Sequence, residues 1–151
     1  MANIVPDSFK AELLAGSHNF EYGVSAQTYK LALYVTTLGP PYTTSSTTYS
    51  TSNEVSSVGT GYSAGGNNLT LGALSGSIPG SNTAIVDFDN LTFSSVTLTA
   101  LGAAIYNSST TPANMLCLVL DFGGNKTATS GDFTIQFPNP TAADAIIRLG
   151  D

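Results

Sequence analysis

The chain has 151 residues, of which 42% are hydrophobic, enough for a single domain whose core needs no disulfide or metal. Only 9% are charged, against roughly 25% in ordinary soluble proteins, so Ser, Thr, Gly and Asn must form most of the polar surface. The formal net charge is −6 and only four residues are cationic, which argues against direct binding to nucleic acid and against docking on an anionic membrane. The opening residues lack a basic and an apolar segment, so we expect no signal peptide and synthesis in a cytoplasm.

The first predicted element is a short helix over residues 6–16. Asp7 or Ser8 is a suitable N-cap, and Gly16 favours a stop after barely two turns. Apolar residues recur at helical spacing: Phe9, Leu13 and Leu14. We expect residues 1–18 to form an N-terminal segment attached to the domain.

Period-two alternation begins after residue 19. In residues 28–35, Leu31, Leu33 and Val35 fall on one face and Lys30 on the other, which predicts a strand with one buried face.

Residues 36–66 are dominated by Thr, Ser and Gly and have little to bury. Long loops in compact domains are usually functional or mobile. This composition predicts an extended loop or arm, either on the surface of the domain or ordered only against a neighbouring molecule.

The rest of the chain predicts short strands separated by turns. Gly102 marks a bulge or bend, and residues 115–122 are apolar on both faces, as in a central strand. Turns are expected at residues 79–82 and 121–126. The predicted strands are residues 68–74, 84–88, 93–107, 115–122, 131–137 and 145–149. We therefore expect an all-β, single-domain β-sandwich over residues 1–151, jelly-roll or immunoglobulin-like, with a short N-terminal helix.

Catalytic and metal-binding chemistry is sparse in this sequence. His18 is the only histidine and Cys117 the only cysteine, and Cys117 lies inside an apolar run without a cation nearby. A triad would need a nucleophile beside His18, and a zinc site would need more Cys or His ligands. We expect a buried structural cysteine, no cofactor and no enzyme activity.

Two pairs of carboxylates need a separate interpretation. Asp87 and Asp89 lie two residues apart and could contribute oxygen ligands to a calcium site, but a solvent-facing Asp87 and a turn at Asp89 are the ordinary alternative. Asp121 and Asp132 could act as the acid and base of a glycosidase, yet both lie at strand ends beside glycine, where turn carboxylates are common.

Several segments together resemble a family of small virion proteins of tailed bacteriophages. The similar segments, which span nearly the whole chain, are ANIVPDSFKAELLAG (2–16), YKLALY (29–34), GYSAGG (61–66), VDF (86–88), GAAIYN (102–107), LDFG (120–123) and GDFTIQFP (131–138). The resemblance implies a structural component of the virion, made in the host cytoplasm, without a catalytic signature.

We therefore expect a capsid decoration or cement protein that forms homo-oligomers on the major capsid protein or on other virion proteins. Contacts are expected from the N-terminal segment or from residues 36–66. The candidate partner contacts are Phe9, Leu13, Tyr42, Tyr49 and Tyr62.

Three alternatives stay open. One is a head-tail, tail or fibre-associated virion component. A carbohydrate-binding module or adhesin is another, with tyrosines as sugar-stacking platforms. These are Tyr22, Tyr29, Tyr34, Tyr42, Tyr49, Tyr62 and Tyr106. A glycosidase that uses Asp121 and Asp132 as its acid and base is the third alternative and the weakest.

Overall fold

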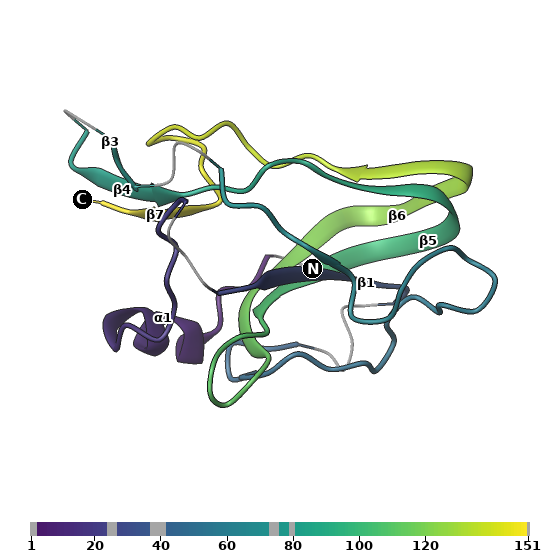
Figure 1. The fold of residues 1–151 in the computed structure, drawn as a ribbon, viewed down its shortest axis with the longest axis horizontal. Coiled ribbons are helices and arrows are strands. Elements are labelled where there is room, and N and C mark those ends of the chain that lie inside the picture. Colours follow the sequence, from purple (N-terminus) through teal and green to yellow (C-terminus); the bar gives the residue numbers. More distant parts are fainter. Residues whose placement is uncertain (1–2, 24–26, 37–41, 73–75, 79–80, 151) are drawn as a thin grey trace.

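The computed structural model describes residues 3–23, 27–36, 42–72, 76–78 and 81–150. Its elements are α1 (Asp7–Leu14), β1 (Tyr29–Tyr34), β2 (Asn67–Asn68), β3 (Gly76–Ile78), β4 (Thr83–Val86), β5 (Leu91–Asn107), β6 (Met115–Ile135) and β7 (Ile147–Leu149). The strands form two antiparallel sheets, β2-β1-β5-β6 and β3-β4-β7 (Figure 1). The fold is all-β with one short helix, as the alternation predicts.

One long hairpin, β5 with β6, organises the molecule. Its ladder shifts register between Ala100, which faces Lys126, and Gly102, which faces Asp121, so residues 122–125 bulge out of β6. Bulges bend a strand pair and increase its twist, and the hairpin folds back over itself (Figure 1). The bend predicted at Gly102 is confirmed, whereas the turn predicted at residues 121–126 is a bulge inside one continuous strand.

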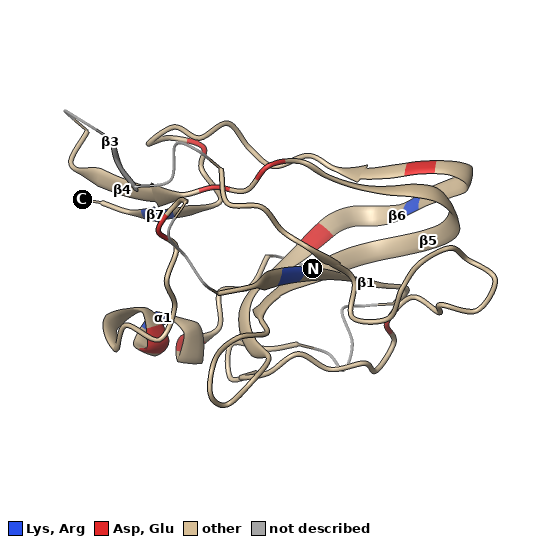
Figure 2. Cartoon of the chain, viewed as in Figure 1, with Lys and Arg blue, Asp and Glu red and all other residues tan. Residues whose placement is uncertain are grey.

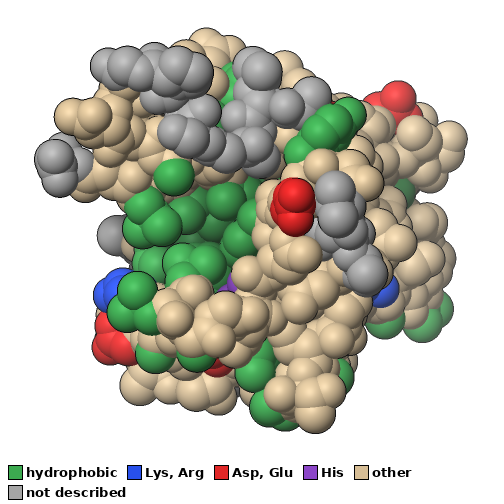
Figure 3. All heavy atoms as spheres, turned by 60° about the vertical axis from the view of Figure 1, so that its left-hand side comes forward, with side chains coloured by type: hydrophobic (Ala, Val, Ile, Leu, Met, Phe, Trp, Pro, Cys, Tyr) green, Lys and Arg blue, Asp and Glu red, His purple; other side chains and the backbone are tan. Residues whose placement is uncertain are grey.

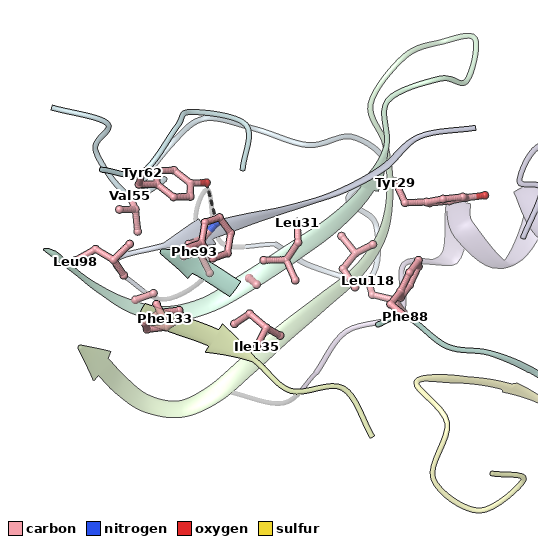
Figure 4. Packing of buried hydrophobic residues seen from close by; sticks show 14 of the residues in the cluster. Tyr29, Leu31, Val55, Tyr62, Phe88, Phe93, Leu98, Leu118, Phe133 and Ile135 are labelled. Atoms are coloured by element: carbon pink, nitrogen blue, oxygen red, sulfur yellow. Dashed lines mark hydrogen bonds between the residues drawn. The ribbon is translucent and has the colours of Figure 1, made fainter. Parts of the chain in front are cut away.

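The main hydrophobic core lies between the two halves of this folded hairpin. Side chains from both halves and from β1 point toward one another, and the Tyr62 hydroxyl accepts the backbone N–H of Leu33 at 3.1 Å (Figure 4). The buried residues include Leu31, Leu33, Phe93, Val96, Leu98, Ile105, Leu118, Phe133 and Ile135. Leu31 and Leu33 are thus buried as their alternation predicts, whereas Val35, expected on the same buried face, follows the end of β1 and is 41% exposed.

β1 is buried on both faces, contrary to the single buried face that its alternation predicts. Leu31 and Leu33 join the main core, while Ala32 and Tyr34 belong to a second cluster on the other side of the sheet. Tyr42 and Tyr49 belong to this second cluster and cover that face. A strand with sheet neighbours on each side and cover on both faces needs no polar face.

The described part of the predicted loop or arm, residues 36 and 42–66, contains no named helix or strand. Tyr42, Val55 and Tyr62 are buried in the chain's own clusters, so this segment is packed against its own sheet. Residues 37–41 of the predicted arm lie outside the described residues, as do residues 1–2 of the N-terminal segment.

Boundaries of the remaining predictions differ by a few residues. The N-cap of α1 is Pro6 without a side-chain cap, and Asp7 instead pairs with Lys10 at 2.8 Å; Gly16 follows the helix with φ +72°. The strand predicted at residues 68–74 is reduced to β2 and an isolated bridge between Leu71 and Phe88. Residues 73–74, and 79–80 of the predicted turn, lie outside the described residues.

Candidate functional site

One face of the small sheet presents apolar side chains that the core only half buries. Register pairs Val86 with Ile147 and Ala84 with Leu149, so these side chains share a face. Val86 and Ile147 pack against the main core, whereas Ala84, further along the same face, is exposed. Leu149, at its outer end, is 61% exposed.

The N-terminal segment supplies further apolar residues. Leu13 of α1 and Phe20 are partly buried against the main core, and Leu14 is 93% exposed. Figure 3 shows hydrophobic side chains gathered in a hollow between α1 and the small sheet. Four of these residues pack against the main core, Leu13, Phe20, Val86 and Ile147, and we call them, together with their exposed neighbours Leu14 on α1 and Leu149 on β7, the apolar hollow.

Charge contributes little to the described surface. Figure 2 shows Lys, Arg, Asp and Glu scattered along the chain, and Lys10 forms its ion pair with Asp7 on α1 itself. An exposed apolar group on a weakly charged surface is typical of a protein–protein contact. The apolar hollow is therefore the candidate functional site.

The predicted partner contacts lie mostly elsewhere. Phe9, Tyr42 and Tyr62 are buried in the chain's own core and Tyr49 is half-buried, so the first three are closed to a partner in this structure. Leu13 lines the apolar hollow as a half-buried residue. Sequence reasoning did not single out Leu14 and Leu149, which are exposed apolar residues. Adjacent helical residues lie about 100° apart, so a two-turn helix that half-buries Leu13 leaves Leu14 outside.

Two of the predicted contacts, Tyr49 and Tyr62, instead belong to a polar network around Glu54, while Tyr42 is hydrogen-bonded to the Tyr34 hydroxyl and the Ser50 N–H. Glu54 Oε1 accepts from the Tyr62 hydroxyl and the Gly65 N–H, both at 2.6 Å, and Glu54 Oε2 accepts from the Tyr49 hydroxyl at 2.5 Å. Charge-assisted hydrogen bonds of this kind are the strong ones. They tie the segment to itself, and two of the tied residues are bonded to the sheet: the Leu33 N–H donates to the Tyr62 hydroxyl at 3.1 Å, and the Tyr106 hydroxyl donates to the Gly65 carbonyl at 2.7 Å.

Burial also removes most of the tyrosines from the surface. Of the seven, Tyr29, Tyr34, Tyr42, Tyr62 and Tyr106 are buried and Tyr49 is stacked on Tyr106 at 4.3 Å between ring centroids. Tyr22 alone is well exposed, at 50%. The sugar-stacking platforms of the carbohydrate hypothesis are therefore reduced to one ring.

The only histidine and the only cysteine are brought together by the fold. Cys117 Sγ lies 3.9 Å from His18 Nδ1, and Glu12 Oε2 lies 2.9 Å from His18 Nε2. This neighbourhood was not visible from the sequence because 99 residues separate the thiol from the ring. The thiol is fully buried, and burial raises its pKa well above the usual thiol range. A protonated, buried thiol is not a nucleophile, so the group is structural.

The candidate carboxylates differ in their surroundings. Asp87 is buried, contrary to the solvent-facing position expected, and burial raises the pKa of its carboxyl while the Phe88 N–H lowers it. Asp121 and Asp132 lie on opposite sides of the bulge, and the groove of about 420 Å³ beside Asp132 is not lined by Asp121. Among the described residues, no three His, Cys, Asp or Glu side chains are placed to hold a metal ion.

The chain matches no protein-family model, no curated protein sequence and no solved structure. Within the described ranges, no helix has the length and apolar character that a bilayer crossing requires.

Proposed function

We propose that this chain is a structural protein of a tailed-phage particle, a decoration or cement protein that binds the major capsid protein lattice through the apolar hollow. The observation that carries the proposal is the exposure of Leu14 and Leu149 beside half-buried apolar residues. A contact surface of this kind excludes water without needing charge pairs, and this chain has few charges to offer.

The position of these leucines in the sequence supports the same proposal. Leu13 and Leu14 belong to the opening segment that carries part of the resemblance to small phage virion proteins. A lattice presents the same binding site many times, so modest contacts repeated over many copies hold a decoration protein in place.

The arrangement of the strands as a sandwich is also part of this proposal. We infer a β-sandwich in which the two halves of the β5–β6 hairpin supply the facing layers, and the side chains of the main core interdigitate between them. Such a rigid body presents its surface loops and terminal segments in fixed positions.

The test is the copy number of the chain in purified particles, measured by quantitative mass spectrometry against the major capsid protein. A copy number close to that of the capsid lattice supports decoration. A dozen copies or fewer indicates a head-tail, tail or fibre component, and absence from the particle overturns the proposal.

The site is tested with Leu14→Asp in a binding assay on particles that lack the chain. Leu14 is 93% exposed, so its replacement leaves the fold intact while a charge enters the contact. Val58→Asp is the matched control, since Val58 is 86% exposed in the 56–60 loop, outside the hollow. We expect loss of binding only in Leu14→Asp; equal binding by both variants rejects the hollow as the contact.

A further inference from the structure

β6 is the outer strand of its sheet, and two bridges from described residues cover the first part of its outer edge. Thr48 bridges to Met115, and Ile4 bridges to Val119 with two backbone hydrogen bonds of 2.9 Å. Across the described ranges, no other segment pairs with the outer edge at residues 132–136. This stretch is an open strand edge, a template for pairing with another strand.

The direction of the backbone groups follows from one hydrogen bond. The Phe137 N–H donates to Asn90 Oδ1 at 2.9 Å, on the side of β5. Backbone groups alternate in direction along a strand, so those of Phe133 and Ile135 point to β5 while those of Thr134 and Gln136 point outward. Residues 132–136 line an open groove of about 420 Å³ together with Phe122, Lys126 and Thr127.

Residues 132–136 are also where the edge becomes regular. Ser130 and Ser95 have φ of +46° and +56°, and the ladder shifts register around them. Beyond these bulges Phe133 to Ile135 pair with Phe93 to Leu91 in unbroken register. Bulges protect the preceding part of the edge from pairing, and this last part lacks that protection.

We propose that a second copy of this chain pairs with this edge, antiparallel and about a two-fold axis, with Thr134 opposite Thr134. The edge is self-complementary in that register, because Asp132 meets Gln136 and Phe133 meets Ile135. In the neighbouring register that also lets outward-facing backbone groups meet, the two-fold axis passes through Asp132. That register places two carboxylates opposite each other and runs into the bulge at Ser130.

The contact is isologous and closes at two copies. It extends the sheet across the dimer, with main-chain hydrogen bonds as its principal attraction. The pairing goes beyond the proposed function and does not depend on it, because the edge is open whether or not the protein is bound to a particle.

The experiment is sedimentation analysis of the purified chain up to about 1 mM, the range of weak association. Thr134→Lys puts two cations opposite each other at the axis and raises the dimer dissociation constant at least about tenfold. Thr92→Lys is the matched control: Thr92 and Thr134 share one hydroxyl hydrogen bond of 2.8 Å, and both are exposed, but Thr92 lies on β5. The control variant retains the dimer.

A Thr134→Cys variant tests the register. Directly opposed residues lie about 5.5 Å apart at their Cα atoms, within the range of a disulfide. Mild oxidation is expected to give a covalent dimer with Thr134→Cys and none with Thr92→Cys, and the buried Cys117 does not compete. Monomers at every concentration, equal effects of the two lysine variants, or association beyond dimers each overturn the proposal.

Discussion

His18 Nδ1 lies 3.1 Å from the side-chain amide nitrogen of Asn107, a residue 89 positions further along the chain. Because an amide nitrogen can only donate, Nδ1 accepts and the ring proton sits on Nε2, which donates to Glu12 Oε2 at 2.9 Å. The other Asn107 amide hydrogen goes to Gln27 Oε1 at 2.8 Å. A single fully buried amide thus joins the N-terminal segment to the hairpin.

Replacing that amide by an apolar group of similar shape leaves the buried His18 Nδ1 without its nitrogen donor. We expect Asn107→Leu to lower the free energy of unfolding by about 1–3 kcal/mol, since Gln27 Oε1 keeps the Asn19 N–H and the Tyr29 hydroxyl as donors. Urea unfolding measures the loss. Asn125→Leu, an exposed replacement in the bulge, should change stability little; a similar loss in both variants would contradict the network.

The carboxylate of Glu54 is expected to hold residues 42–66 on the sheet. Glu54→Ala removes the acceptor of Tyr49, Tyr62 and Gly65 and should destabilise the chain by about 3 kcal/mol. Hydrogen exchange should increase first in residues 42–66 if opening is local. Glu21→Ala, an exposed carboxylate, serves as the control, and unchanged exchange in Glu54→Ala would show that packing alone holds the segment.

Stability should fall steeply in alkali. Burial raises the pKa of Tyr106 to about 12, and burial also raises those of Tyr34, Tyr49 and Tyr62 above the phenol value of about 10. A group with a raised pKa holds its proton more tightly when folded, so this stability is complete below about pH 10 and is lost above it. Each phenol contributes a slope of up to about 1.4 kcal/mol per pH unit.

Phenolate absorbance and circular dichroism followed together from pH 8 to 13 measure this dependence. We expect most tyrosines to ionise in the same step as unfolding. Ionisation of all seven near pH 10 in a folded chain would contradict the burial seen here.

Two glycines with nearly equal φ angles differ in the atoms that surround them. Gly66 has φ +68° and a Cβ built there lies 1.7 Å from the Leu31 carbonyl oxygen, whereas Gly123 has φ +71° and nothing within 4 Å. Gly123→Ala should cost about 1–2 kcal/mol from its backbone conformation alone.

Gly66→Ala adds a clash with the backbone of β1, which cannot move without breaking its pairing with β5. We expect a loss of more than about 4 kcal/mol or no folded protein. Thermal unfolding of the two variants, measured side by side, separates the cost of the backbone conformation from the cost of the steric clash. Equal unfolding midpoints would refute the predicted clash at Gly66.

Local patterns in the sequence were sufficient for part of this architecture. Alternation placed Leu31 and Leu33 on one buried face, and both are buried, because side chains on a strand alternate whatever lies further away. The stop at Gly16 and the bend at Gly102 are likewise local, since they depend on backbone conformation.

Only the tertiary structure decided which surfaces are covered. Nothing local distinguishes a polar arm from a polar segment that packs its few tyrosines on a sheet, so Tyr42 and Tyr62 were expected outside and lie inside. The opening sequence predicted a helix with Leu13 and Leu14. Whether another apolar surface lies opposite that helix depends on a sheet built from residues more than 60 positions away. Burial is a property of contacts between distant segments, and the folding-back of the β5–β6 hairpin determines which segments meet.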